Sequence, residues 1–471
     1  MVATKILNKI HEIEPLVSEC NDLATGSECF LSFNLIEQSL IWWKHFRQHD
    51  ELAFGQLRGR NFYGVQSSVN EFHLVIAEEN GNICGVVPLV SMTVKLGGGE
   101  GTVRILSFAS DSVLCAYCDF LVSPTNRHPI INELFQTILD LTLREHDILF
   151  LGYIPDNSPN LPYLRDFLAK CLNAGWQGGF VPNRRRGGVQ PWTIGAITNH
   201  CKNLLIKLNP SQPELAELTS DLINFKKAKL LFPKTRVVLQ KKIESVLGFL
   251  PDEDDVRREK DAILEQLAPA LIKYPYIKLP KNRETYLSSL SKETRRYFRR
   301  YGKRFKESGG FFEKILPEKI TNEDLDDYLN LHSQKWQDDS AAVNKSTIEF
   351  HRELGMTMAR SGHFCLFFAK IDGRRIAAHS CFDLNGRREG YFTGRDPSRD
   401  ELRAGRLLYM ETILDAIEQG FSIYDLGYGG DAYKMSFTDT FSAVNNLILA
   451  PGEKMPTLQK VFPKYEYIDL D

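Results

Sequence analysis

The sequence predicts a mixed α/β protein of the α+β class, with two lobes that are each a mostly antiparallel sheet flanked by helices. Three observations carry this prediction: a strand–hairpin–helix–strand pattern late in the chain, an earlier copy of that pattern, and a charged helical segment with no counterpart in either copy. The expected boundaries are residues 1–200 for the first lobe, 201–272 for a helical insertion and 273–471 for the second lobe.

Two turn dipeptides organise the late pattern. Asp372-Gly373 and Asn385-Gly386 separate runs rich in β-forming residues, and such pairs favour the type I′ turn of a two-residue hairpin. A polar loop then leads to a helix that begins near Ala404 and carries apolar residues at helical spacing up to Gly420. The predicted strands cover residues 364–370, 375–384, 388–394 and 422–426.

The earlier copy lies between residues 72 and 153. The tetrad Thr-Ile-Leu-Asp at 137–140 recurs at 412–415, and in each copy Leu-Gly-Tyr follows after ten residues. We interpret this as a tandem duplication, and two long units are too few for a solenoid. Four further matches share one offset: Phe72, Leu74, Ala77 and Gly81 correspond to Phe364, Leu366, Ala369 and Gly373.

The two copies differ where chemistry is expected. In this alignment Ile130 takes the place of Gly405, and Phe150 takes the place of Asp425. The first copy therefore lacks both the glycine at the helix entrance and the acid at the end of the strand. We expect the second copy to be the active one, and the first copy to support it or to shape a cleft between the two.

Two charged segments complete the chain. Residues 205–270 are rich in Lys, Glu and Leu, which predicts helices and not a third sheet. Residues 291–307 predict a basic helix with aromatic residues on one side and arginine and lysine on much of the rest. Such a face is more often solvated than occupied, yet its charge exceeds what solubility requires, so an anionic acceptor, donor or lipid headgroup is an alternative.

Composition limits the remaining classes. Among 471 residues the formal net charge is −2, which gives no case for DNA binding by the whole protein. An odd number of cysteines without regular spacing, together with no secretory signal, predicts a cytoplasmic protein. No apolar run approaches the ~18 residues that a membrane span needs, so we expect no transmembrane segment, while peripheral membrane contact stays open.

Several motifs, in this order, resemble the CelD-type acetyltransferases of the GNAT superfamily, a family associated with cellulose and exopolysaccharide biosynthesis and related to the Fem-type aminoacyltransferases. The motifs are the Arg-rich helix at 287–309, a helix that ends in Trp336, the hairpin at 372–378, and the run from Asp425-Leu-Gly to Tyr433-Lys434. The resemblance is good over 275–445 and weak over 30–195. One departure concerns the helix entrance, where Leu402-Arg-Ala-Gly-Arg-Leu407 keeps a single glycine of the usual acetyl-CoA signature.

The resemblance implies a donor site at that helix entrance. Gly405, with Arg403 and Arg406, would bind the phosphates of acetyl-CoA or another acyl-CoA at a helix N-terminus. The alternative is an ordinary helix start with solvated arginines. Because the Fem relatives use aminoacyl-tRNA without the glycine signature, the donor stays open between the two.

For catalysis, the sequence offers Asp425, His379 and Tyr433. Asp425 ends an apolar strand, where an unpaired carboxylate would be costly, so it is either a base or a partner for a backbone N–H or an arginine. A lone His379 in mid-strand is more often a core residue than a catalyst. Trp336, Lys434, Arg295 and Arg299 are the candidate substrate-binding residues, with solvation as the alternative for the cations. No metal is expected, because Cys115 and Cys118 have neither a second pair nor a histidine at ligand spacing.

Together these observations predict an acyltransferase whose second lobe moves an acyl group from acyl-CoA to an amine or hydroxyl of a small or glycan-type acceptor, anionic or neutral, in polysaccharide or cell-envelope biosynthesis. The backbone of the strand at 388–394 would bind the thioester oxygen. Two alternatives stay open: a Fem-like transferase that uses aminoacyl-tRNA, and a non-catalytic scaffold. The identity of the acceptor and the oligomeric state do not follow from the sequence.

Overall fold

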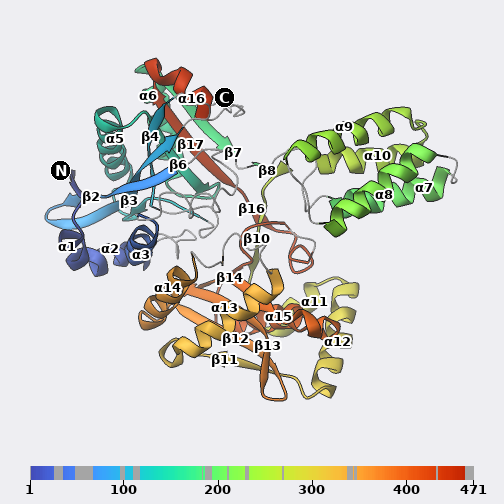
Figure 1. The fold of residues 1–471 in the computed structure, drawn as a ribbon. Coiled ribbons are helices and arrows are strands. Elements are labelled where there is room, and N and C mark those ends of the chain that lie inside the picture. Colours follow the sequence, from blue (N-terminus) through green and yellow to red (C-terminus); the bar gives the residue numbers. More distant parts are fainter. Residues whose placement is uncertain are drawn as a thin grey trace. The chain divides into compact units, whose positions relative to one another are not determined.

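The computed structural model describes residues 2–25, 35–47, 67–95, 101–109, 117–182, 184–185, 194–208, 212–228, 233–267, 270–336, 343, 347–430 and 433–461. The chain divides into two compact units. The first unit joins Met1–Pro182 to Lys273–Asp471 and contains both large sheets, and the second unit is Asn183–Ile272 (Figure 1). In the part of the chain that is described, no helix is long and apolar enough to cross a membrane.

The first sheet has the strand order β1-β2-β3-β4-β6-β17-β7, and β5 pairs with β3. Strand β3 is antiparallel to β2 and to β4, whereas β4 and β6 are parallel. Because parallel neighbours need a crossover, helix α5 connects them, and it packs on β1, β2 and β3. The strands are β1 Val2–Leu7, β2 Ser67–Glu79, β3 Asn82–Lys95, β4 Thr102–Phe108, β5 Leu121–Val122, β6 Ile148–Pro155, β7 Trp176–Pro182 and β17 Val444–Pro451.

The helices of this first lobe come mostly before β2 and after β5. They are α1 Ile10–Ile13, α2 Val17–Thr25, α3 Ile36–Phe46, α5 Arg127–Glu145 and α6 Leu161–Asn173, with α16 Met455–Val461 after β17. Short 3-10 turns lie at Glu14–Leu16 and Gly452–Lys454. Close packing of α5 depends on Gly85 of β3, where an added Cβ would lie 2.7 Å from Cγ2 of Ile130.

The second sheet has the order β11-β12-β13-β14-β15-β10-β16. Both hairpins form where the turn dipeptides predict them: Asp372, Gly373, Asn385 and Gly386 all have positive φ, as a type I′ turn requires. Its strands are β10 Tyr274–Lys278, β11 Phe311–Ile315, β12 Phe364–Ile371, β13 Arg374–Leu384, β14 Arg387–Arg395, β15 Ile423–Asp425 and β16 Phe441–Ser442.

Helices cover both faces of the second sheet. On β13, Ser380 bonds Tyr328 of α13, whereas its neighbour His379 bonds Thr412 of α15. Since side chains alternate along a strand, α13 and α15 lie on opposite faces. The helices are α11 Arg283–Ser289, α12 Lys292–Glu307, α13 Asn322–Trp336, α14 Ile348–Arg360 and α15 Ala404–Glu418, with 3-10 turns at Pro317–Lys319 and Pro397–Leu402.

The two lobes share one strand order, which confirms the prediction of a repeated pattern. In each lobe three antiparallel strands lead through a helix to a strand parallel to the third. The registers agree as well: Phe150 pairs with Ser107 in the first lobe, and Asp425 pairs with Glu389 in the second. Phe150 therefore occupies the position of Asp425, as the sequence alignment predicts.

The alignment of the helix entrances needs a correction. Asn126 and Arg403 precede α5 and α15 respectively, and both have the unusual left-handed conformation, with φ of 59° and 55°. Counted from these matching residues, Gly405 corresponds to the exposed His128, and not to Ile130. The sequence alignment misses this because α5 is four residues longer than α15, with 19 residues against 15.

The second half of the chain contributes one strand to the first sheet. β17 follows the second lobe in the chain, yet it pairs with β6 and β7 of the first sheet. β10 begins the second lobe and lies at the equivalent place in the second sheet, between β15 and β16. The predicted second lobe of 273–471 thus gives its strand at 444–451 to the first sheet, a pairing that no local sequence signal specifies.

The second compact unit is helical, as the charged segment predicts. Its helices are α7 Ile194–Leu208, α8 Pro213–Ala228, α9 Pro233–Phe249 and α10 Asp254–Leu267, and strands β8 Arg184–Arg185 and β9 Ala270–Leu271 pair at its base. Buried leucines and isoleucines from all four helices form a core of their own. The unit begins at Asn183, earlier than the predicted residue 201.

Candidate active site

The N-terminus of α15 is the place where the sequence predicts the phosphates of the donor. Among the described residues no side chain caps the helix, and its first turn contains no acidic residue. Gly405 needs neither a left-handed backbone nor close packing, because a Cβ placed there would lie 3.8 Å from its nearest neighbour, Cδ of Arg395. The protein itself therefore tolerates a side chain at Gly405, and only a ligand that approaches the backbone N–H groups would require glycine.

The two predicted arginines at this helix differ. The Arg403 side chain is exposed and stays a candidate for a phosphate. Arg406 instead donates from Nη2 to Oγ of Ser436 over 2.7 Å, and its guanidinium lies 4.1 Å from the ring centroid of Tyr297. Arg406 thus ties α15 to α12 and to the loop at 436, so the structure gives it a packing role that the sequence does not predict.

Strands β14 and β15 separate beside this helix. Their parallel pairing ends at Glu389 and Asp425, while β14 continues to Arg395. The register between β13 and β14 shifts next to this point, and Ser380 Oγ accepts a hydrogen bond from the backbone N–H of Phe392. The predicted source of N–H groups for a thioester oxygen, the strand at 388–394, therefore has a bulge where its neighbour β15 ends.

Asp425 is held at the end of β15 by two donors. Its Oδ1 accepts from the backbone N–H of Gly427 over 2.6 Å, and its Oδ2 accepts from the phenol of Tyr117 over 2.7 Å. Only 1% of the residue is exposed. Burial raises the pKa of Asp425 to about 6, against the hydrogen bonds and the positive charges of Lys434 and Arg387, which lower it. The carboxylate is thus mostly ionised at neutral pH and has the proton affinity of a useful base.

His379 lies on the other face of the sheet. Tyr424, the neighbour of Asp425, bonds Thr412 of α15, as His379 does, so Asp425 points to the opposite face. Burial, together with the nearby charges of Lys335, Arg388 and Lys434, lowers the pKa of His379 to about 3. The structure therefore does not bring the two predicted catalytic groups together, and a neutral imidazole of such low pKa is a weak base.

His379 nevertheless faces a narrow space in the sheet. A Cβ on Gly390 of β14 would lie 3.0 Å from Nε2 of His379 and 3.0 Å from the hydroxyl of Tyr409. Among the described residues, Nε2 of His379 has no hydrogen-bond partner. Gly390 is needed here because any larger residue would displace these two side chains.

Tyr433 and Lys434 follow the glycine loop, as predicted. Tyr433 packs with Tyr409, whose ring centroid is 6.0 Å away. Lys434 is 7% exposed, and its Nζ donates to the backbone carbonyl of Tyr428 over 2.6 Å. Lys434 is therefore not a solvated surface lysine, because it ties the loop together and adds positive charge near Asp425.

The predicted substrate-binding residues separate into three cases. Arg295 donates to the carbonyl oxygens of Ser288 and Leu290, so it fixes the connection between α11 and α12. Arg299 is exposed on α12. The side chain of Trp336 lies outside the described residues.

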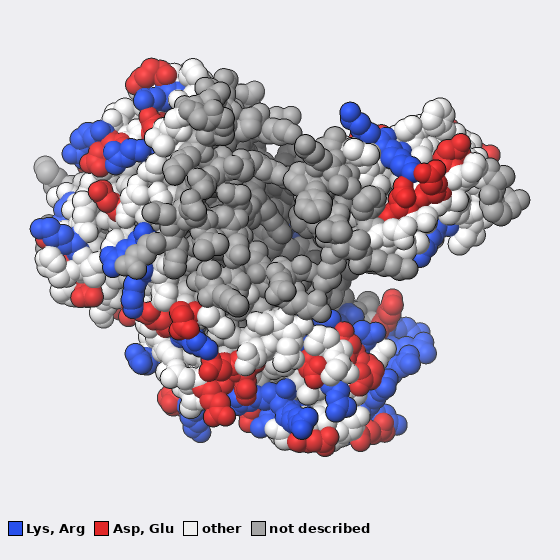
Figure 2. All heavy atoms as spheres, in the orientation of Figure 1, with Lys and Arg blue, Asp and Glu red and all other residues white. Residues whose placement is uncertain are grey.

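Helix α12 presents a cationic face. Figure 2 shows blue side chains gathered over the part of the second lobe where Figure 1 places α12. Its aromatic residues Phe298 and Phe305 instead pack against the core. Because the guanidinium of Arg406 lies over the ring of Tyr297, helix α12 lies next to the N-terminus of α15. The exposed cations are Lys292, Arg296, Arg299, Arg300, Lys303, Arg304 and Lys306.

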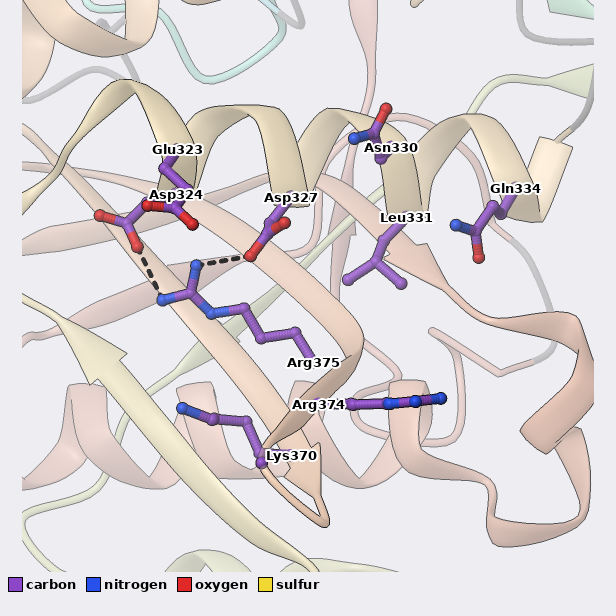
Figure 3. Close-up of a pocket in the computed structure, with 10 residues that line it drawn as sticks. Glu323, Asp324, Asp327, Asn330, Leu331, Gln334, Lys370, Arg374 and Arg375 are labelled. Carbon is purple, nitrogen blue, oxygen red and sulfur yellow. Dashed lines mark hydrogen bonds and ion pairs between the residues drawn. The ribbon is translucent and has the colours of Figure 1, made fainter.

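A polar groove of about 600 Å³ lies between α13 and the β12–β13 hairpin (Figure 3). In it, Arg375 donates to Asp324 over 2.6 Å and to Asp327 over 2.9 Å. Three acidic and three basic residues line the groove, namely Glu323, Asp324, Asp327, Lys370, Arg374 and Arg375. Since the charges balance and the arginine is already paired, we interpret this groove as a surface ion-pair network that fastens α13 to the hairpin.

Sequence reasoning missed Tyr117 entirely. No motif marks it, and its partner Asp425 is 308 residues away in the chain. Only the approach of the two lobes makes it part of the site. For metals, the described residues contain no group of three or more His, Cys, Asp or Glu side chains that could hold an ion.

Comparison with known proteins finds a family match over part of the second lobe. The family model of an acetyltransferase (GNAT) domain matches residues 292–435, which cover the helix α12, the hairpins, α15 and the Asp425 loop. By sequence, no curated protein matches the chain. The second lobe contains the matched domain and the first lobe repeats its strand order, so the fold is a tandem of two GNAT-like lobes.

Three solved structures show similarity over nearly the whole chain. FemX is 9% identical and has a TM-score of 0.49, with 97% of this chain and 100% of that one covered. L-PGS from Bacillus licheniformis is 9% identical with a TM-score of 0.42 and coverages of 91% and 97%. A tandem GNAT protein from the clavulanic acid biosynthesis pathway is 9% identical with a TM-score of 0.38 and coverages of 96% and 99%. At these values the similarities say nothing of activity.

Proposed function

We propose that the second lobe transfers an acyl group from an acyl-CoA to an amine or hydroxyl acceptor, with Asp425 as the general base. The observation that carries this proposal is a buried carboxylate with a pKa of about 6, at the point where β14 and β15 separate. Burial raises the pKa of this carboxylate although two hydrogen-bond donors and two nearby cations lower it. The match of residues 292–435 to an acetyltransferase domain supports the same assignment.

Each group then has a role. The free N–H groups of the first turn of α15 and Arg403 bind the diphosphate of CoA, and Gly405 lets it approach. Backbone N–H groups of the bulged β14 bind the thioester oxygen. The acceptor nitrogen or oxygen attacks the carbonyl carbon as Asp425 takes its proton. The carbon–sulfur bond then breaks, CoA leaves as a thiolate that takes up a proton from water, and Asp425 returns the acceptor's proton to water.

The family resemblance and the surface charge of α12 support a proposal for the class of acceptor. The resemblance of the second half to the CelD-type family favours a glycan or a cell-envelope precursor, and acetyl-CoA as the donor. Exposed cations on α12, including Arg299, favour an acceptor that is itself anionic.

A second candidate function is transfer from aminoacyl-tRNA, and the cationic face of α12 is the observation that favours it. A CoA molecule has phosphates at only two places, whereas α12 exposes seven cations along 16 residues, or about 24 Å of helix. Like charges at such spacing destabilise an isolated helix, and a polyanion would relieve that repulsion. Because the apolar side of α12 faces the protein core, a lipid surface fits this helix less well than a nucleic acid does.

Charge reversal separates the two candidates. The double variant Arg296→Glu, Arg299→Glu changes two exposed residues of α12, and Lys319→Glu, Arg360→Glu makes the same change elsewhere on the second lobe. With acyl-CoA as the donor, we expect the affinity for acetyl-CoA to fall less than tenfold in the first variant. Binding of total tRNA to the wild type and to both variants should show no steep salt dependence.

With aminoacyl-tRNA as the donor, wild-type affinity for tRNA should fall steeply with salt. The slope should lessen by roughly one unit for each phosphate that the first variant no longer binds, and the control variant should behave as wild type. Fluorescence anisotropy at several salt concentrations measures both ligands. Binding of neither ligand would favour the scaffold alternative.

A further inference from the structure

A residue of the first lobe reaches the reaction centre that we assign to the second. Tyr117 precedes β5 of the first sheet, and its hydroxyl donates to Oδ2 of Asp425 over 2.7 Å. Tyr117 is fully buried and Asp425 is 1% exposed, so water does not compete for this bond. The ring of Tyr117 packs 5.1 Å from that of Tyr274, at the start of β10.

Building on the proposed function, we propose that Tyr117 is a positioning residue: the first lobe uses its hydroxyl to orient the Asp425 carboxylate and to keep it ionised for proton transfer. This gives the first lobe, which has Phe150 where the second has Asp425, a part in the chemistry of the other lobe.

The backbone next to Tyr117 is hydrogen-bonded within the first lobe. The backbone N–H of the next residue, Cys118, donates to the carbonyl of Tyr153 over 3.0 Å. Tyr153 has a left-handed backbone with φ of 65°, and its own N–H donates to Oδ1 of Asn446 over 3.1 Å. Asn446 belongs to β17, the strand that the second half of the chain gives to the first sheet. Strand β17 thus helps to fix the backbone next to Tyr117, the residue that contacts Asp425.

The segment after Tyr117 is also well fixed. Asp119 is fully buried and accepts from the backbone N–H of Phe120, from Ser158 Oγ and from the amide of Asn160. These bonds tie residues 117–120 to the turn that follows β6. The backbone that carries Tyr117 is therefore anchored in the first lobe, while its ring packs against Tyr274 of the second sheet.

Burial and several neighbours besides Tyr117 raise or lower the pKa of Asp425. Tyr117, the Gly427 N–H, Lys434 and Arg387 all favour the carboxylate, and burial opposes it. Glu389 lies opposite Asp425 on β14, and Tyr276 lies opposite on β10. Among the causes that favour the carboxylate, the bond from Tyr117 is the largest, so its removal should be felt most.

Tyr117→Phe removes the hydroxyl and keeps the ring. A hydrogen bond to a charged group is worth about one to two units of pKa, so we expect the titration midpoint of Asp425 to rise from about 6 by that amount. Carboxyl ¹³C NMR of aspartate-labelled full-length protein measures it, with the resonance assigned by its loss in Asp425→Asn. Tyr286→Phe is the matched control, since that buried hydroxyl donates to the carbonyl of Phe437 instead. It should leave the Asp425 midpoint in place.

The reaction gives a second readout, with acetyl-CoA as donor and hydroxylamine as probe acceptor. The acidic limb of the pH–rate profile should move up with the NMR midpoint. At pH 7 the rate of Tyr117→Phe should fall about twofold to tenfold, and it should recover near pH 9, because only the ionised fraction of Asp425 changes. A purely structural loss would lower the rate equally at every pH.

Each outcome decides a part of the proposal. An unchanged Asp425 midpoint in Tyr117→Phe would overturn it, whatever the activity. A raised midpoint without any acetyl transfer by the wild type would overturn the proposed function and the catalytic half of this inference, and would leave Tyr117 only as a lobe-to-lobe contact. If the Phe variant did not fold, 3-fluorotyrosine placed at position 117 is a stronger donor and should lower the midpoint. A midpoint that did not fall would again overturn the proposal.

Discussion

A chain that ends at Ala443 is expected to lose the fold of its first lobe, although every residue of 1–182 is still present. The truncation removes β17, which lies between β6 and β7 in the first sheet. It deletes Val444, Leu447, Ile448 and Leu449, all with no exposed surface. Burial of such side chains contributes roughly 1.5–3 kcal/mol each, so their sum is comparable with the whole stability of a typical domain.

Hydrogen exchange measured by mass spectrometry reports this loss strand by strand. Amides of β6 and β7 should exchange at least a hundredfold faster in the truncated chain, because their backbone partners on β17 are gone. A chain that ends at Val461 is the control and should keep its protection. Adding a peptide of residues 444–451 should restore protection in part. A truncated chain with wild-type protection in β6 and β7 would contradict the placement of β17 between these two strands.

Asp425→Asn is expected to lower acyl transfer by about a hundredfold or more at pH 7, because general base catalysis contributes that much and an amide accepts no proton. The loss should not come from unfolding. Since burial raises the pKa of Asp425 to about 6, its ionisation opposes folding: the stability contributed by the neutral form is complete below the unfolded pKa and lost as pH rises through 6. The neutral asparagine should therefore be as stable at pH 7 as the wild type, or more so.

Urea denaturation at pH 5 and pH 7 checks the stability, and thiol release from acetyl-CoA with hydroxylamine checks the rate. The wild-type rate should rise with pH through about 6, where Asp425 ionises. Asn variants at Asp383, which pairs with the buried Arg388, should instead lose stability and serve as the contrast. An Asp425→Asn enzyme with more than a tenth of wild-type activity would remove Asp425 from the role of base.

The elements that the sequence predicts well are those set by neighbours in the chain. Asp372-Gly373 and Asn385-Gly386 determine the two hairpins because their backbone preference is local. The match of Phe150 with Asp425 follows from repeated spacing, and the sheet registers bear it out. The helices of the insertion are predicted by the helical periodicity and the charged composition of residues 205–270.

What the sequence misses depends on contacts between distant segments. β17 has an ordinary apolar pattern, and nothing local says which sheet it joins. Arg406 looks free for a phosphate until α12 brings Tyr297 under its guanidinium. Tyr117 becomes part of the site only because the first lobe places it against Asp425. His379 is the opposite case, a residue of catalytic type that strand alternation directs to the other face from Asp425.

We expect the second lobe, and not the first, to bind acyl-CoA at its helix entrance, and a titration of the protein with acetyl-CoA measures this. Wild type should gain about 2.7 kcal/mol of stability at a hundredfold excess over the dissociation constant. Gly405→Ile should lose that gain, because under the proposal the diphosphate approaches the backbone at Gly405, where a branched side chain would stand in its way. His128→Ile makes the equivalent change at the first lobe's helix, where Pro129 already removes one N–H, and it should respond as wild type does. No stabilisation of the wild type, or an undiminished response in Gly405→Ile, would contradict this expectation.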